Sequence, residues 1–426
     1  METYGKILLI AMPAFLFLVL FEKWYGWRKG HDTVRNMDMI ASLSSGITNV
    51  TKDVLGLSIV IISYGWMADH FAVTHVKGTL LTYIVAFLAL DFAGYWTHRI
   101  QHKVNLFWNG HIIHHSSEEY NLACALRQSI SSMVKIFVVF LLPAALLGVP
   151  EKVIAIVAPL HLFAQFWYHT QHIGKMGFLE KVIVTPSHHR VHHAMNPEYI
   201  DKNFGQIFIF WDKWFGTYQP ELPAVQPVYG ITRPAATWNP IKINFQHIWL
   251  LMKDAWRTRH WRDKLRIWFM PTGWRPADIA DKYPVYKITD VYHFTKYHPQ
   301  PNKALQYWAW CRITVLLLLI SYLFGNIAAI NTMNNSYIYL YGLFIFLDVY
   351  AYTELMDRNR YALVPELVKT VFGLSLIYQQ GDWFGAESQL AYISYILAAY
   401  FVVSSIVTVV FVSGFKKEKK EVALAA

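Results

Sequence analysis

Long apolar runs lie toward both ends of the chain and leave a polar stretch between them. Apolar runs near the ~20 residues that a bilayer requires predict membrane spans. In the first block these are about 5–22, one within 40–66, and about 78–97. A further apolar stretch, 136–166, is interrupted at Gly148-Val149-Pro150 and predicts two helices or a re-entrant hairpin. The second block predicts four more spans, at about 308–330, 336–355, 362–380 and 390–413.

The stretch 167–305 is polar and rich in Trp, Pro and Lys, and no segment in it is apolar enough to cross a membrane. We interpret it as a cap apposed to the membrane, because an indole ring suits the interface with one wet and one apolar side. The alternative is a packed soluble subdomain. The tryptophans concerned are Trp238, Trp249, Trp256, Trp261, Trp268 and Trp274.

Composition agrees with a membrane protein. Hydrophobic residues make up 55% of the chain and charged residues only 15%, against roughly 25% charged in soluble domains. The net charge of +10 suits anionic lipid headgroups. No basic stripe or nucleic-acid motif accompanies this charge, so a nucleic-acid partner is not indicated. The basic run 416–420 favours a cytoplasmic C-terminus.

The run from Ile7 to Leu20 resembles the apolar region of a signal peptide. It is followed by Phe21-Glu22-Lys23-Trp24 rather than by small residues typical of a cleavage site, so we predict a retained anchor. We expect an integral, multi-pass membrane protein. Its compartment would be the endoplasmic reticulum in a eukaryote and the cytoplasmic membrane in a bacterium.

Several cofactors are excluded by the motifs. Two cysteines, Cys124 and Cys311, are too few for a disulfide framework, a cysteine zinc site or an iron–sulfur cluster. Neither G-x-G-x-x-G nor G-x-x-x-x-G-K-[ST] occurs. A redox enzyme of this composition must therefore receive its electrons from a partner protein or a diffusible reductant.

Histidines are concentrated in one part of the chain: 12 of the 19 fall between His98 and His193. The pattern H-x-x-H-H occurs twice, and H-x-x-x-H precedes both copies. On a helix, spacings of three and four place side chains on one face, and eight imidazoles exceed what one ion takes. We therefore predict a two-metal site. Its core ligands are His98, His102, His111, His114, His115, His189, His192 and His193.

Four other histidines lie near these clusters. We predict that His169 completes the shell of the second metal. His172 and His161 are weaker candidates. His188 lies one residue off the ligand face of its cluster, so we interpret it as a residue that either supports the ligands from behind or has a purely structural role.

Asp91 precedes His98 by seven residues, two helical turns, so the two share a face. We expect its carboxylate to hold an imidazole N–H and fix the tautomer of the ring. The clusters contain no Cys and no carboxylate, which argues against structural zinc and against the Glu-rich di-iron sites of soluble bundles. Imidazole suits Zn, Cu, Fe and Ni alike, so ligand type alone does not identify the metal.

The order H-x-x-x-H, H-x-x-H-H, P-x-x-H-x-x-H-H resembles the fatty acid hydroxylase/sterol desaturase superfamily of membrane di-iron enzymes. Over roughly residues 35–290, further motifs resemble its ether-lipid branch, the alkylglycerol monooxygenase family. These motifs are Asn109–His111, Ser116–Leu122, Ala125–Ser129, Phe166–Thr170, Asp201–Phe204, Trp211–Thr217, Tyr229–Thr232 and Asn239–Lys242.

The resemblance implies an O2-dependent monooxygenase that acts on lipid alkyl chains, with two Fe ions held by the eight core histidines. It also implies an external reductant, tetrahydropterin or an electron-transfer protein. Asp212 in the motif W-D-x-x-F-G-T, and Asn203, would support the ligands from behind. The chain departs from the pattern at Lys103, where a Glu is expected after the second His, and at His172, which has no counterpart.

We therefore expect an all-α, polytopic membrane protein with a His-rich di-metal helical core. Residues 1–75 would form N-terminal anchor helices, 76–305 the di-iron catalytic domain, and 306–426 a four-span membrane domain with a basic tail. The leading hypothesis is hydroxylation beside an ether oxygen, which releases an aldehyde and a glycerol derivative. Alternatives are a sterol, carotenoid or fatty-acyl hydroxylase or desaturase and, more remotely, a metal transporter or sensor. The oligomeric state stays open.

Overall fold

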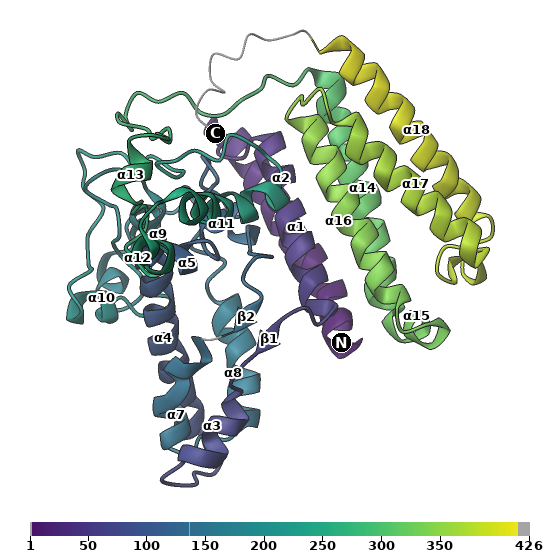
Figure 1. Ribbon diagram of the computed structural model, residues 1–426. Coiled ribbons are helices and arrows are strands. Elements are labelled where there is room, and N and C mark those ends of the chain that lie inside the picture. The colour runs from purple at the N-terminus through teal and green to yellow at the C-terminus, as the bar shows by residue number, and fades with distance from the viewer. Residues whose placement is uncertain (1, 136, 416–426) are drawn as a thin grey trace.

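The computed structural model describes residues 2–135 and 137–415, and within these ranges it is helical with two very short strands, which confirms the predicted all-α fold (Figure 1). The described residues include five helices long and apolar enough to cross a membrane. They are α1 (Glu2–Lys29), α4 (Leu80–Lys103), α14 (Lys303–Gly325), α16 (Tyr337–Met356) and α18 (Ile393–Gly414). The predicted basic tail, 416–420, lies outside the described residues.

The span predicted within 40–66 is wrong as a single helix. Helix α2 (Asn36–Val54) ends early, and the chain continues through β1 (Ile59–Val60) to α3 (Tyr64–Phe71). Helix α2 is mostly buried inside the protein. Its polar side chains find partners there, whereas in lipid they would be costly to leave unpaired.

The predicted break in 136–166 is present. Short helices η2 (Phe137–Leu141) and α7 (Leu142–Leu146) are followed by α8 (Glu151–Phe163), which packs against α4. Gly148 between them has φ +66°, and a Cβ there would lie 1.7 Å from the carbonyl oxygen of Thr74, so only glycine fits. Strand β2 (Val134–Lys135) pairs in parallel with β1.

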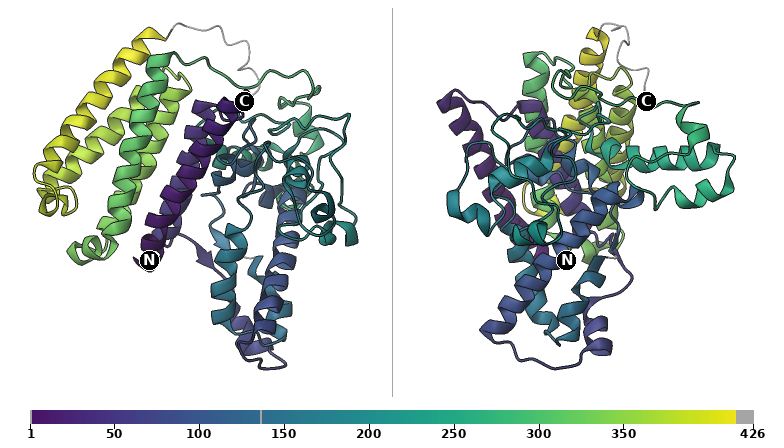
Figure 2. Two further views of the ribbon diagram at one scale, coloured as in Figure 1. Left: turned by 180° about the vertical axis from the view of Figure 1, so that it is seen from behind. Right: turned by 90° about the vertical axis from the view of Figure 1, so that its left-hand side faces the viewer.

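The C-terminal helices pack side by side, and α1 and α2 stand between them and the histidine-bearing half (Figures 1 and 2). Helix α14 contacts both α1 and α2, and one hydrophobic core runs through all of them. Asn302 caps α14 by accepting a hydrogen bond from the backbone N–H of Leu305. The remaining elements of this half are α15 (Ile327–Met333), α17 (Leu363–Gln380) and η4 (Ala386–Ser388).

Helix α17 is not among the five apolar helices, although it falls on a predicted span. It carries Glu366 and Lys369, both buried, toward Arg312 of α14 and Asp348 of α16. These charges lower its hydropathy, and they are tolerated because they pair with each other inside the bundle.

The cap consists of short helices and loops near the end of α4 (Figure 1). Trp249, Trp256 and Trp261 are exposed by 57%, 86% and 65%, as an interfacial position requires, whereas Trp238 is buried. The cap helices are η3 (Gly177–Lys181), α9 (Pro186–His193), α10 (Phe210–Trp214), α11 (Pro240–Arg257), α12 (Trp261–Arg266) and α13 (Ala277–Ala280). Three short helices between α4 and the cap are α5 (Asn105–Trp108), α6 (Ile112–His115) and η1 (Cys124–Leu126).

Candidate metal centre

Four segments deliver histidines to one place: the end of α4, the α6 region, the loop before residue 170, and α9. Because residues four apart share a helix face, α4 brings His98 and His102 together and α9 brings His189 and His193 together. Pro186 opens α9 at its first position, where the missing N–H costs nothing.

All nine predicted imidazoles meet in two adjoining groups, in each of which the candidate ligand atoms lie within 4.8 Å of one another. The larger group contains His98, His102, His111, His115 and His192. The smaller group contains His114, His169, His189 and His193. The two groups touch where the rings of His115 and His193 stack with their centroids 4.3 Å apart.

The outer nitrogens of several rings face backbone carbonyls. Nδ1 of His98 lies 2.9 Å from the carbonyl oxygen of Phe204, and Nδ1 of His192 lies 2.9 Å from that of Lys202. A carbonyl oxygen only accepts, so each Nδ1 carries the proton and, in the neutral ring, Nε2 presents its lone pair inward. This is the tautomer that a metal ligand needs.

The inward nitrogens lie too close for neutral rings without a cation. Nδ1 of His114 and Nδ1 of His169 both face carbonyl oxygens, yet their Nε2 atoms are only 3.4 Å apart. Two lone pairs cannot hydrogen-bond to each other, and a cation between them removes the conflict. The donor set therefore fits metal ions.

Burial keeps these imidazoles neutral at pH 7. It lowers the pKa of His169 to about 4. Burial, followed by the neighbouring imidazoles, lowers the pKa of His114 and of His193 well below the usual value. The neutral ring is the form that binds a metal.

One loop, residues 202–205, supplies the carbonyls that orient His98 and His192, and two predicted residues hold it. Asp212 accepts hydrogen bonds from the backbone N–H groups of Phe204 and Gly205, each at 2.7 Å. Asn203 donates to the carbonyl oxygen of Gln219 at 2.7 Å. Both residues thus lie one step behind the imidazoles.

The carboxylate of Asp91 lies against an imidazole, as we expect, but the ring is that of His161 and not that of His98. This carboxylate accepts hydrogen bonds from the backbone N–H of Ile207 at 2.8 Å and from Nε1 of Trp211 at 2.9 Å, and it lies 2.8 Å from Nε2 of His161. Seven residues along a helix rise about 10.5 Å, so sharing a face does not bring the two side chains into contact. Asp91 instead fixes the segment that follows the loop 202–205.

The weaker candidates lie outside both groups. Nδ1 of His188 faces the hydroxyl of Thr185, and Nε2 of His172 lies 3.2 Å from the hydroxyl of Thr33. His161 belongs to the Asp91 site described above.

Lys103 lies beside the larger group and is neutralised by Asp201. Its Nζ donates to one oxygen of Asp201 at 2.7 Å, while the other oxygen lies 3.5 Å from Nδ1 of His102. Lys103 is therefore linked to His102 through the carboxylate of Asp201.

Sequence reasoning did not assign roles to Arg127 and Phe204. The carbonyl oxygen of Arg127 faces Nδ1 of His114, and the ring of Phe204 packs against His98, His102 and His192. Arg127 lies in a motif that supports the family resemblance. Its carbonyl oxygen could not be predicted as a hydrogen-bond acceptor, because every residue type carries one.

A cavity of about 240 Å³ reaches the imidazoles of the larger group. His115 and His192 lie in its wall, together with apolar side chains from α5, α6 and α11. These apolar residues are Trp108, Ile112, Leu250 and Leu251. The cavity can therefore place a hydrocarbon chain beside a metal.

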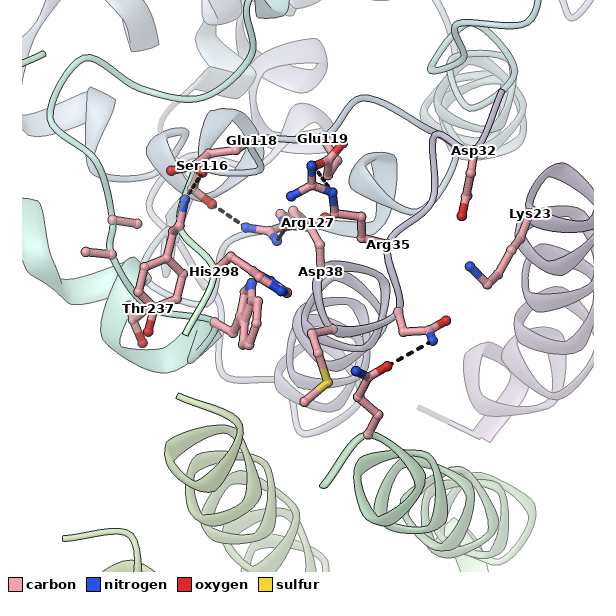
Figure 3. A pocket seen from close by; sticks show the side chains of 17 residues that line it. Lys23, Asp32, Arg35, Asp38, Ser116, Glu118, Glu119, Arg127, Thr237 and His298 are labelled. Atoms are coloured by element: carbon pink, nitrogen blue, oxygen red, sulfur yellow. Dashed lines mark hydrogen bonds and ion pairs between the residues drawn. The ribbon is translucent and has the colours of Figure 1, made fainter. Parts of the chain in front are cut away.

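A second pocket has a volume of about 230 Å³, and Ser116 and Arg127 are among the residues that line it (Figure 3). Its charges are largely paired with each other. Arg127 donates to Asp38 at 2.6 Å, and Nε of Arg35 lies 3.0 Å from Glu119.

The model of the fatty acid hydroxylase family matches residues 83–217. Alkylglycerol monooxygenase of Homo sapiens is 33% identical over 372 residues, which cover 86% of this chain and 81% of that protein. The chain belongs to the fatty acid hydroxylase family.

Two further relatives are a second alkylglycerol monooxygenase and a bacterial lipid hydroxylase. Alkylglycerol monooxygenase of Danio rerio is 37% identical over 66% of this chain and 64% of its own length. The ornithine lipid hydroxylase of Rhizobium tropici is 26% identical over 36% and 46%. No solved structure matches the chain.

Membership of the fatty acid hydroxylase family confirms the enzyme class. The protein is a metal-dependent lipid monooxygenase and a multi-pass integral membrane protein. The transporter or sensor hypothesis is therefore set aside.

Proposed function

We propose that this monooxygenase cleaves the ether bond of alkylglycerol-type lipids at a centre of two irons. One observation carries the proposal: two adjoining groups of imidazoles, five and four, present their ring nitrogens inward beside an apolar cavity. The curated relatives named alkylglycerol monooxygenase support this choice of substrate.

Within this proposal, each group of imidazoles holds one iron. Imidazole also suits zinc and copper, so the choice of iron rests on the family. Asp212 and Asn203 act as positioning residues, because they hold the loop whose carbonyls orient His98 and His192.

The bound irons would supply the activation of O2, for which the reaction consumes two electrons and two protons. One oxygen atom enters the C–H bond next to the ether oxygen and the other leaves as water. The product carbon then carries both a hydroxyl and the ether oxygen. Such a hemiacetal collapses to an aldehyde and a free glycerol hydroxyl.

The residues of the chain position the substrate and limit water. The ring of Trp108 packs against His102 with centroids 5.0 Å apart, and Ile112 and Leu251 line the same cavity. An apolar wall this close to the ligands orients the alkyl chain and strengthens electrostatic interactions within the site.

The electrons come from outside the chain. No dinucleotide-binding motif is present, so we propose an external reductant, tetrahydropterin or an electron-transfer protein. We further propose the endoplasmic reticulum as the compartment in a eukaryote and the cytoplasmic membrane in a bacterium.

Metal content of the detergent-purified protein tests the iron centre. We expect about two irons per chain by elemental analysis, coupled as a pair in Mössbauer spectra, and His193→Ala should lower bound iron and abolish activity. The control is His172→Ala, which removes an imidazole outside both groups. Stoichiometric zinc in native material, or full activity of the His193 variant, would refute the assignment.

A panel of alkylglycerols, sterols and fatty acids tests the substrate. We expect O2-dependent aldehyde release from alkylglycerols only. If the products are instead hydroxylated or desaturated sterols, carotenoids or fatty acyl chains, the proposed iron centre stands but the proposed alkylglycerol substrate is wrong.

A further inference from the structure

Arg233 lines the cavity beside the larger histidine group, and ether cleavage gives it no role. It is half-buried. Among residues 2–135 and 137–415, Arg233 makes no ion pair or hydrogen bond, and Asp254, whose charge acts on it, is already held by Arg275.

Other buried arginines of the chain are paired. Arg275 in the same cavity donates to Asp254 through two nitrogens at 2.6 and 2.9 Å, and Arg190 donates to Glu221 at 2.8 Å. Arg127 in the second pocket donates to Asp38 (Figure 3). Arg233 differs from these arginines, because it faces the cavity without an ion pair of its own.

The surroundings of Arg233 favour an anion. Burial, followed by the nearby Arg275, lowers the pKa of Arg233, although a guanidinium stays protonated in proteins. Burial, followed by Arg233, lowers the pKa of His247 to about 4, so this neighbouring ring is neutral at pH 7 and adds no charge to the cavity. Lys287 adds an exposed ammonium to the same cavity.

A hydroxyl also lacks a partner in this wall. Oγ1 of Thr272 is buried and makes no hydrogen bond with any described residue, and Thr272 lines the cavity. A buried hydroxyl without a partner is costly. A ligand oxygen at this position would satisfy it.

We propose that Arg233, Lys287 and Thr272 form a subsite for the phosphate of an anionic ether-lipid headgroup. A planar guanidinium matches phosphate geometry, and an ammonium and a hydroxyl complete the contacts. The imidazoles and this subsite lie in one cavity, as a headgroup joined to the ether carbon through glycerol requires. This inference rests on the proposed function and deepens its substrate class.

The test compares two ether lipids with the same alkyl chain, one with a neutral glycerol headgroup and one with a phosphodiester headgroup. In Arg233→Gln, the ratio of kcat/KM for the phosphate lipid to that for the neutral lipid should fall about 10- to 100-fold, because a charged hydrogen bond is lost. Arg233→Lys should restore part of the ratio. Arg262→Gln, which removes an exposed cation of the cap, should leave the ratio unchanged.

Inorganic phosphate separates a lipid headgroup from free phosphate as the ligand. If it competes with the neutral lipid in the wild type as strongly as the phosphate lipid does, the subsite takes free phosphate and the headgroup assignment is overturned. An unchanged kcat/KM ratio in Arg233→Gln would also overturn the headgroup assignment. If that ratio is unchanged because kcat/KM falls equally for both lipids, Arg233 has a structural role.

Direct binding distinguishes this inference from the proposed function. A phosphate-bearing alkyl ether titrated into the metal-loaded protein without reductant should bind about 10- to 100-fold more weakly to Arg233→Gln. If the wild type shows this binding but cleaves neither lipid, the proposed reaction fails and the subsite stands. Equal binding by both proteins refutes the subsite.

Discussion

Seven of the nine histidines of the metal centre are buried, as is a charged quartet in the C-terminal bundle, but the polar groups of the two clusters are satisfied differently. In the quartet, Arg312 donates to Asp348 at 2.6 Å and to Glu366 at 2.9 Å, and Lys369 donates to Glu366 within 2.7 Å. Two cations meet two carboxylates. In the metal centre, by contrast, the nitrogen lone pair of one imidazole faces the lone pair of another.

This difference separates a structural cluster from a binding site. Complementary charges need nothing from outside, so the quartet joins α14, α16 and α17 as a self-contained unit. Nitrogens that face one another without shared protons require a cation. Burial alone does not reveal function, whereas the chemical complementarity within a buried cluster does.

The largest expected effect comes from removing an imidazole at the centre of the larger group. Nε2 of His115 lies 3.1 Å from Nε2 of both His102 and His192. We expect His115→Ala to abolish turnover and lower bound iron, measured by product formation and elemental analysis. Arg312→Met, in contrast, should retain its iron per folded chain. Equal loss of iron in both variants would contradict the distinction.

Breaking the quartet should affect stability instead. Arg312→Met leaves Asp348 buried without its closest partner and removes one of the two cations that pair with Glu366, which costs about 3–5 kcal/mol. Thermal unfolding in detergent should show the loss. Replacing all four charges with apolar residues of similar volume should recover most of it. If the fourfold variant is as unstable as the single one, the quartet has a role beyond mutual neutralisation.

A smaller effect is expected one step behind the imidazoles. Asp212→Asn weakens the hold on Phe204 and Gly205, so metal affinity or activity should fall about 10- to 100-fold. Metal titration and turnover measure it. Asp278→Asn, an exposed carboxylate that accepts from Thr258, is the matched control. Equal behaviour of the two variants would show that the loop needs no anchor.

The smallest effect concerns pH. Burial lowers the pKa of His169 and of His188 to about 4, whereas an unfolded chain binds these protons near pH 6.5. The unfolded state therefore binds protons at a higher pH than the folded state. Protein stripped of metal by a chelator should lose stability as pH falls from about 6.5 to about 4. Melting temperatures across this range test it. Iron-loaded protein should keep its melting temperature down to a lower pH. A melting temperature of the metal-free protein that does not change with pH would contradict the prediction.

Helix spacing explains how much of the metal centre the sequence could predict. Residues four apart on one helix share a group, as His189 and His193 do, and this follows from helix geometry. The neighbours His192 and His193 belong to different groups, because adjacent residues of a helix point about 100° apart. The division into five and four depends on how the helices pack, which local spacing does not contain.

The fold shows the same limit. Apolar length identified the five long helices, but α2 carries polar residues that pair with distant partners, and α17 carries half of the quartet. The carboxylate of Asp91 shared the correct helix face but contacts a segment more than 100 residues away. Long-range pairing was the missing information in each case.

The burial of α2 has a consequence for how the protein is made. Of its 19 residues, 14 are buried; Asp38 pairs with Arg127 beside the metal centre, and Ser44 hydrogen-bonds Tyr352 of α16. Helix α14, which also covers α2, follows it by about 250 residues, a delay of roughly 10–50 s at ribosomal speed. The wall of the metal centre thus gains its final support only late in synthesis, so metal loading should follow translation.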